Sequence, residues 1–366
     1  MKMFVRMPTC CTWYALLHRF TSCLALIGAL VLSGCALEGN GPQSQKLAAI
    51  KARDRLICGV NGKLPGFSFV GSDGSYSGFE VDICKAVAAG VLSDASKVEF
   101  RDLSSSERFA AVTSGEVDLL SRSTTVTLSR DAAGGNGLSF GPVNFYGGQA
   151  VMVNATSNLN TLKDLAGKPI CVTTGTTTEL NLADRMRELK AAYTPLKFQT
   201  DSQTYAAYLQ GRCPAVTSDR ALLAAKRSSF PDPKAHVLLS GDLSKEPLAP
   251  ATTNSDPIWA DAVRWISYAL MQAEESGITQ ANVERKLAEA KADSNQADLR
   301  RLLGVDGDLG EQLGLPNDFV VQVVKAVGNY GEVFERNLGS STPIQLDRAS
   351  NRQWSNGGLL YSPPFR

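Results

Sequence analysis

Histidine is almost missing from this sequence, although most hydrolytic and metal-dependent sites rely on it. The 366 residues contain only His18 and His236. Because His18 lies in the N-terminal segment described below as an export signal, a Ser-His-Asp hydrolase would depend on His236 alone, and no Gly-x-Ser-x-Gly segment accompanies it. Histidine and cysteine do not cluster at ligand spacings, so the sequence predicts no metal site.

Nucleotide-binding loops and a marked net charge are also missing. Neither a Walker loop nor a Gly-x-Gly-x-x-Gly fingerprint occurs, and we expect no cofactor. The formal net charge is +1, so the composition does not demand the basic face that a nucleic-acid-binding protein presents. These absences argue against an enzyme and against a nucleic-acid partner.

The N-terminal segment has a composition unlike that of the remaining chain. Residues 1–34 hold three basic side chains and no acidic one, followed by the apolar run "FTSCLALIGALVLSG". A basic head before an apolar run that is short for a membrane span is typical of a secretory signal peptide. We therefore expect an exported protein.

The apolar run ends in Leu32-Ser33-Gly34-Cys35, which resembles a bacterial lipobox. This resemblance implies that Cys35 becomes an acylated N-terminus, a lipid anchor that holds the protein at a membrane. The polar residues that follow would then form a tether over residues 35–49. The alternative is an ordinary small-residue cleavage site with an incidental cysteine.

Four cysteines remain after residue 35, namely Cys58, Cys84, Cys171 and Cys213. An even number of cysteines in an exported domain predicts two disulfides, and three pairings are possible. The grouping of strands and helices described next favours Cys58–Cys84 and Cys171–Cys213. Each bond would then connect a strand to the unit that follows it.

Strand and helix patterns alternate over residues 54–125 and again over residues 162–230. Within 76–92, for example, Phe79, Ile83, Val87 and Val91 recur at helical spacing. Extended stretches near 145–155 and 243–257 flank the second block. The sequence therefore predicts an α/β protein with one lobe built from 50–147 and 250–366, and a second from 148–249. In such folds ligands bind at the carboxyl ends of strands that face a cleft.

The stretch "GFEVDICKAVAAGV" (78–91) resembles the family 3 solute-binding proteins, the polar amino acid receptors of ABC importers. The segment "KAVGNYGEVFERNLG" resembles the longer, general L-amino-acid-binding subgroup. The resemblance implies a type II periplasmic-binding-protein-like fold with a two-strand hinge and a helical C-terminal extension. It also implies a monomeric periplasmic protein that binds an L-amino acid, broadly or with preference for acidic and amide side chains, and delivers it to an inner-membrane permease.

The same resemblance assigns ligand-binding roles to residues of this sequence. In "SRSTTVTLSR" (121–130), the hydroxyls of Ser123 and Thr125 and the guanidinium of Arg130 would bind the ligand's carboxylate, as their chemistry permits. Thr176 or Thr177 would add a further donor. Asp219, with Asn61 in place of an aspartate found in many members, would bind the ammonium group.

The sequence also permits other roles for several of these residues. Asp219 could cap the helix that follows it, and Thr176 could cap a helix in the pattern Thr176-x-x-Glu179. Arg122 could lie on the outer face of a strand over 116–125, or it could reach the ligand's side chain and favour glutamate, aspartate or their amides.

The roles of two apolar residues and the choice between two alternative functions are undecided at this point. Leu64 stands where an aromatic ring often stacks on the ligand, and Phe67 could belong to the core or to the cleft wall. A dehydratase-like enzyme built on the same fold is one alternative function. A ligand-binding adaptor for a chemoreceptor is the other.

Overall fold

The computed structural model describes residues 43–366. The predicted signal peptide (1–34) and lipid anchor Cys35 lie outside the described residues. The predicted tether over 35–49 is wrong at its end, because helix α1 (Gln45–Arg53) begins there. Ser44 accepts a hydrogen bond from the Leu47 amide, and Leu47 and Ile50 are buried, so capping and apolar burial favour a helix. None of the described helices has the length and apolar character that crossing a membrane requires.

The first lobe contains a five-stranded sheet with the strand order β5-β1-β6-β14-β7. The first three strands are parallel, and β14 runs antiparallel to both β6 and β7. The apolar sequence of β1 is buried along most of its length, as expected for a strand inside a parallel sheet. The strands are β1 (Leu56–Val60), β5 (Val98–Asp102), β6 (Leu119–Leu120), β7 (Leu138–Phe140) and β14 (Ala251–Thr253).

The second lobe contains a sheet with the order β10-β9-β11-β8-β12. Because β10, β9 and β11 are parallel, their carboxyl ends meet at one edge, and each is followed there by a turn or helix start. The elements are β8 (Phe145–Asn154), β9 (Pro169–Thr173), α5 (Thr177–Glu188), β10 (Thr194–Phe198), α6 (Asp201–Leu209), β11 (Ala215–Asp219), α7 (Arg220–Arg227) and β12 (His236–Leu238).

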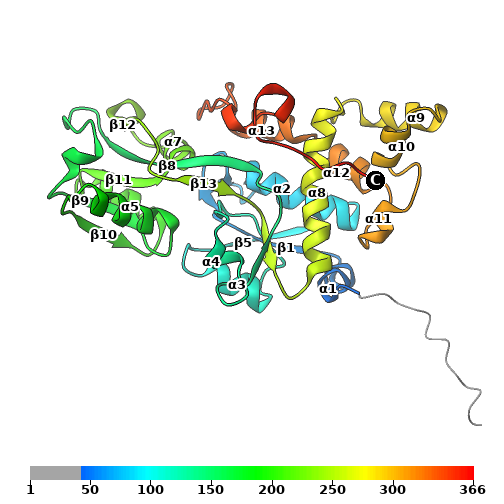
Figure 1. Ribbon diagram of the computed structural model, residues 1–366, viewed down its shortest axis with the longest axis horizontal. Coiled ribbons are helices and arrows are strands. Elements are labelled where there is room, and N and C mark those ends of the chain that lie inside the picture. Colours follow the sequence, from blue (N-terminus) through cyan, green and yellow to red (C-terminus); the bar gives the residue numbers. More distant parts are fainter. Residues whose placement is uncertain (1–42) are drawn as a thin grey trace, which may run out of the picture. The chain divides into compact units, whose positions relative to one another are not determined.

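Two neighbouring strands carry the chain between the lobes (Figure 1). The first half of β8 pairs with β13 (Lys245–Leu248) in antiparallel register, from Phe145 opposite Leu248 to Gly148 opposite Lys245. The second half of β8 pairs with β11 in the second sheet, and β14 follows β13 into the first sheet. The predicted two-lobed α/β fold with a two-strand hinge is confirmed.

The quoted motif of residues 78–91 begins helix α2 (Phe79–Leu92), and its polar residues have separate structural roles. Gly78 has a φ of 127°, and a Cβ there would lie 2.3 Å from the Phe67 carbonyl oxygen, so only glycine fits. Glu80 accepts hydrogen bonds from the amide and hydroxyl of Ser123. Asp82 pairs with Arg336 of the C-terminal extension at 2.8 Å.

The C-terminal extension is helical and packs on α2. Gly328 ends one helix, and Asn329 caps the next through a reciprocal capping box with Glu332. Phe67 is 1% exposed and packs edge-on against Phe79 and Phe145, which makes it a core residue. The helices are α8 (Pro257–Glu275), α9 (Val283–Ala292), α10 (Ala297–Leu302), α11 (Leu309–Gln312), α12 (Phe319–Val327) and α13 (Tyr330–Leu338).

The smaller elements complete the first lobe and the tail. They are the antiparallel strands β2 (Lys63–Leu64), β3 (Ser68–Val70) and β4 (Tyr76–Ser77), the helices α3 (Arg108–Ser114) and α4 (Leu128–Asp131), and the 3₁₀ turns η1 (Leu162–Leu165), η2 (Pro233–Ala235), η3 (Ala349–Asn351) and η4 (Trp354–Asn356).

Both disulfide pairings are confirmed. Cys58 of β1 bonds to Cys84 of α2, and Cys171 of β9 bonds to Cys213 just before β11. Their Cα atoms lie 6.2 and 5.8 Å apart, within the range that a disulfide spans. Each bond joins elements of one lobe, so neither restricts motion of one lobe against the other.

Candidate ligand-binding site

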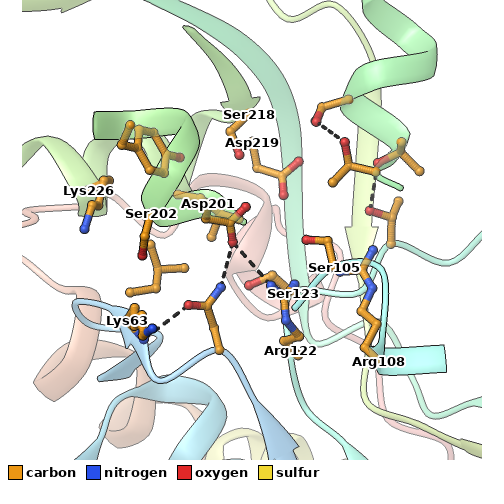
Figure 2. A pocket seen from close by; sticks show the side chains of 18 residues that line it. Lys63, Ser105, Arg108, Arg122, Ser123, Asp201, Ser202, Ser218, Asp219 and Lys226 are labelled. Carbon is orange, nitrogen blue, oxygen red and sulfur yellow. Dashed lines mark hydrogen bonds and ion pairs between the residues drawn. The ribbon is translucent and has the colours of Figure 1, made fainter. Parts of the chain in front are cut away.

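A cleft lies at the edge where the strands of both lobes end, and side chains from both lobes line it (Figure 2). Eight of the ten residues predicted for ligand binding or side-chain specificity line this cleft, and Phe67 and Arg130 do not. The lining residues are Asn61, Lys63, Leu64, Ser105, Arg108, Arg122, Ser123 and Thr125 from the first lobe, and Thr176, Thr177, Thr178, Asp201, Ser202, Tyr205, Ser218, Asp219, Leu222 and Lys226 from the second.

Asp219 ends β11 and points into the cleft (Figure 2). It occupies the N-cap position of α7 but accepts no capping hydrogen bond, so the capping alternative is wrong. The residue is 6% exposed, and its Oδ1 has no hydrogen-bond partner among the described residues. Burial, reinforced by the charge of Glu246, raises the pKa of Asp219 well above its ordinary value. A cationic group in the cleft would satisfy this carboxylate.

Arg122 also faces the cleft, and of the strand predicted over residues 116–125 the structure contains only Leu119–Leu120. Strand β6 ends at Leu120, and Ser123 has a left-handed φ of 40° because its amide and hydroxyl turn toward Glu80. Strict alternation of side chains therefore stops before Arg122. The guanidinium is 5% exposed and donates from Nε to the Leu103 carbonyl at 2.7 Å. The surface alternative for Arg122 is excluded.

Asp201, which the sequence did not single out, joins the two lobes across the cleft. Its Oδ2 accepts hydrogen bonds from Asn61 Nδ2 at 2.8 Å and from Arg122 at 3.3 Å, both in the first lobe. Thr173 of its own lobe donates to Oδ1 at 2.9 Å. Burial alone would raise the pKa of Asp201, but Arg122 and these hydrogen bonds lower it overall. A second carboxylate at position 61 would repel Asp201, which explains the amide there.

The hydroxyl groups predicted to bind carboxylate already donate to protein acceptors. Ser123 donates to Glu80, and Thr125 and Thr177 donate to the buried Glu246 at 2.6 and 2.8 Å. A hydroxyl has one proton, so none of these three can also donate to a ligand in this arrangement. Burial raises the pKa of Glu80. Glu246 lies in the predicted crossing segment 243–257, where nothing in the local pattern indicates its partners.

Thr176 caps helix α5, as one reading of the sequence predicted. Its Oγ1 accepts from the Glu179 amide at 3.2 Å and donates to the Thr173 carbonyl at 2.7 Å. The capping box is incomplete, because the Glu179 carboxylate accepts from the Gly175 amide and not from that of Thr176. Thr176, Thr177 and Thr178, at the N-terminus of this 12-residue helix, line the cleft.

Arg130 lies beside the cleft and not on its surface. Its NH1 donates to the Thr125 carbonyl at 2.8 Å, and its guanidinium packs over the Phe109 ring at 5.0 Å. The side chain is 5% exposed. Its role as the carboxylate-binding arginine stays a prediction.

Arg108, the first residue of α3, lines the cleft but was not predicted from the sequence. It is 3% exposed, and its Nε has no hydrogen-bond partner within residues 43–366. Burial, together with repulsion by Arg122 and Arg130, lowers its pKa well below the ordinary value. Helical spacing to the buried Ala111 and Val112 was the available signal, because it places Arg108 on the buried face.

The charged side chains around the cleft are unequal in number. Four are cationic (Lys63, Arg108, Arg122 and Lys226) and two are carboxylates (Asp201 and Asp219). No group of three or more metal-ligating side chains comes together in the described part of the chain. The cleft is therefore suited to a polar ligand with at least one anionic group.

Comparison with known proteins identifies the family. The family described as "Bacterial extracellular solute-binding proteins, family 3" matches residues 56–301. The chain belongs to this family. Its members bind solutes and are not enzymes, which removes the dehydratase-like alternative from consideration.

Relatives match over nearly the whole chain. The glutamate/glutamine/aspartate/asparagine-binding protein BztA of Rhodobacter capsulatus is 45% identical, over 93% of this chain and 99% of its own. The general L-amino acid-binding periplasmic protein AapJ of Rhizobium johnstonii is 44% identical, over 93% of this chain and 98% of its own. A solved ABC transporter periplasmic binding protein from Brucella ovis, with glutathione bound, is 45% identical with a TM-score of 0.84, covering 88% of this chain and all of that one.

Proposed function

We propose that this family 3 solute-binding protein captures an L-amino acid outside the cytoplasm and delivers it to an ABC permease. The observation that carries the proposal is the buried carboxylate of Asp219, whose Oδ1 has no hydrogen-bond partner within residues 43–366, in a cleft that both lobes line. An isolated buried charge is unfavourable, and an ammonium group would compensate it. The names of the relatives support amino acids, and glutathione itself ends in a free α-amino acid group.

Each pole of the amino acid has a matching region of the cleft. The ammonium group binds Asp219, with Asn61 nearby. The carboxylate binds at the end of the cleft beside the N-terminus of α5, with Ser123, Thr125, Thr176, Thr177 and Arg130 as its predicted partners. The hydroxyls of Ser123, Thr125 and Thr177 then turn from their present acceptors to the ligand. Amide groups at a helix N-terminus favour an anion, which supports this orientation.

Binding closes the lobes, because the groups that contact the amino acid come from both lobes. A ligand stabilises the state for which it has the higher affinity. The contacts of Asp201 with Asn61 and Arg122 add to the closed state independently of the ligand. Hinge motion is confined to β8 and β13, the strands that connect the lobes.

The ligand's side chain points toward Arg122, and acidic and amide side chains are preferred. The excess of cations among the charged lining residues supports this preference. Leu64 lines the same cleft but offers no aromatic ring for stacking on a flat ligand.

Residues 1–34 export the protein to the periplasm, and acylated Cys35 anchors it to a membrane, where the protein works as a monomer. The sequence around Cys35 supports this part of the proposal. Cells grown with labelled palmitate should yield a labelled, membrane-bound protein, and Cys35→Ser should yield an unlabelled, soluble one. Absence of label in the unsubstituted protein would exclude the anchor.

A thermal-shift screen of the purified protein against the twenty amino acids tests the main proposal. A ligand that binds the folded state raises the melting temperature in proportion to the logarithm of its concentration at saturation. We expect shifts with glutamate, glutamine, aspartate and asparagine, and recovery of each compound unchanged. No shift with any amino acid would refute the proposal.

A further inference from the structure

The C-terminal extension contacts the hinge as well as the first lobe. In the turn η3, the side chain of Asn351 forms with Tyr146 of β8 the two hydrogen bonds that a neighbouring strand would form. The Tyr146 amide donates to Asn351 Oδ1 at 2.6 Å, and Asn351 Nδ2 donates to the Tyr146 carbonyl at 3.1 Å. Both backbone groups point away from β13, where Tyr146 lies opposite Pro247. Asn351 is 4% exposed, so these two bonds are shielded from water.

The turn that carries Asn351 is itself held by the first lobe. Arg348 forms an ion pair with Glu274 of α8 and donates from NH2 to the Asn351 carbonyl at 2.8 Å. On the other side of Asn351, the Gln353 Nε2 donates to the Met271 carbonyl of α8 at 3.0 Å. Asn351 therefore connects Tyr146 to a long helix of the first lobe.

Helix α13 of the same extension holds the residues just before Tyr146. The Tyr330 hydroxyl donates to the Asn144 carbonyl at 2.8 Å, and the Phe334 ring stacks on the Phe145 ring at a centroid distance of 6.3 Å. Tyr330 and Phe334 are fully buried. Residues 144–146, at the start of the hinge strand, are thus attached to the first lobe by the extension.

Two glycines separate this attached part of β8 from the second lobe. From Gln149 onward, β8 pairs with β11 in the second sheet. Only Gly147 and Gly148 lie between, and glycine has the widest backbone freedom of all residues. The opposite strand is attached at the same level, because the Pro247 carbonyl of β13 accepts from the Val126 amide of the first lobe at 2.8 Å. Bending of β8 between the lobes is therefore left to the two glycines.

We infer that the C-terminal extension sets the pivot of the hinge, because Asn351 holds Tyr146 to the first lobe and confines bending to Gly147 and Gly148. This inference rests on the proposed closure of the lobes around a ligand. Without Asn351, bending extends to Tyr146, and the ligand-free protein samples a wider range of openings. A smaller fraction of the molecules is then in the closed state that holds the ligand, and the apparent affinity falls with that fraction. Asn351 is thus a positioning residue that acts through the hinge.

Replacement of Asn351 by alanine tests the inference. Small-angle X-ray scattering of the purified protein gives the radius of gyration, and calorimetry gives the affinities for glutamate, glutamine and asparagine. We expect a larger radius of gyration for ligand-free Asn351→Ala and an unchanged one at saturating glutamate. All three dissociation constants should rise by the same factor, roughly three- to tenfold, since two uncharged hydrogen bonds are lost. Asn356→Ala, an exposed asparagine of η4, is the matched control and should change neither quantity.

Three results would overturn the inference. One is a ligand-free radius of gyration and affinities equal to those of Asn356→Ala. Another is an increase in the radius of gyration at saturating ligand as well, which would mean that Asn351 only supports the fold. The third is a loss of affinity for one amino acid alone, which would place Asn351 in ligand recognition. If the unsubstituted protein binds no amino acid, the proposed function fails, whereas scattering by the ligand-free proteins still tests the pivot.

Replacement of Gly147 by alanine tests the pivot independently and in the opposite direction. The nearest atoms to a Cβ at this position, in the Phe145 ring and the Glu246 carbonyl, lie 3.5 and 3.6 Å away, and the φ of Gly147 is not in the left-handed region. Alanine therefore fits the present arrangement of the lobes, but it restricts the backbone of the open forms. Gly147→Ala should lower the ligand-free radius of gyration and tighten the binding of all three amino acids about two- to fivefold. Unchanged scattering and affinities would show that β8 bends elsewhere and would overturn the inference, even if Asn351→Ala does not fold.

Discussion

Replacement of Asp219 by asparagine should weaken ligand binding while it stabilises the ligand-free protein. The two side chains have nearly the same shape, so the change removes a charge without leaving a cavity. Truncating one partner of a buried charge pair costs about 2–5 kcal/mol, which corresponds to roughly 30-fold to several-thousand-fold in affinity. All amino acids should lose affinity alike, because all carry the ammonium group.

The effect on stability follows from the raised pKa of Asp219. Burial, then Glu246, raises this pKa above its ordinary value of 3.8, although Arg108 and Arg130 oppose the shift. Between pH 3.8 and the folded-state pKa, the folded protein keeps a proton that the unfolded chain has released. The free energy of unfolding therefore falls as the pH rises through that interval. Asparagine does not titrate, so the free energy of unfolding of the variant does not fall in this way.

Calorimetry and urea denaturation measure both effects. Asp219→Asn should exceed the unsubstituted protein in free energy of unfolding at pH 7, and the difference should shrink as the pH approaches 4. Glutamate titration at pH 7 should give the loss of affinity. Binding within threefold of the unsubstituted protein would refute the assignment of Asp219, and a variant less stable at pH 7 would refute the argument from burial.

Three further variants test neighbouring parts of the structure. Arg122→Met should weaken glutamate binding by at least about tenfold more than leucine binding, because a charged hydrogen bond is worth about 1.5–3 kcal/mol; equal losses in parallel titrations would contradict its role in specificity. Asn61→Asp should weaken the binding of every ligand, because a carboxylate at position 61 would face the carboxylate of Asp201 across the closing cleft. Unchanged affinities in the same titrations would count against the contact between residues 61 and 201. Replacing Cys171 and Cys213 together by alanine opens a 42-residue loop and should lower the free energy of unfolding by about 4 kcal/mol in urea; a loss under about 1 kcal/mol would show that the bond contributes little.

Local sequence patterns were sufficient for the arrangement of strands and helices. The periodicity of α2 and the alternation of strand and helix in each block depend on residues a few positions apart. The disulfide pairing followed from that grouping, because each bond joins elements of one block. The two mistakes in local structure, at residues 45–49 and 121–125, fall where a cap or a contact with Glu80 overrides composition.

The composition of the cleft depended on tertiary structure. Asp201 meets Asn61 over 140 residues of sequence, and Glu246 meets Thr125 over 121, distances at which no periodic pattern carries information. Sequence determined which residue types stand at the strand ends, since hydroxyl and charged groups end or follow β6, β9, β10 and β11. Only the folded chain decided that Arg108 faces the cleft while Arg130 lies behind Thr125, because burial and hydrogen bonding depend on which elements pack against each guanidinium.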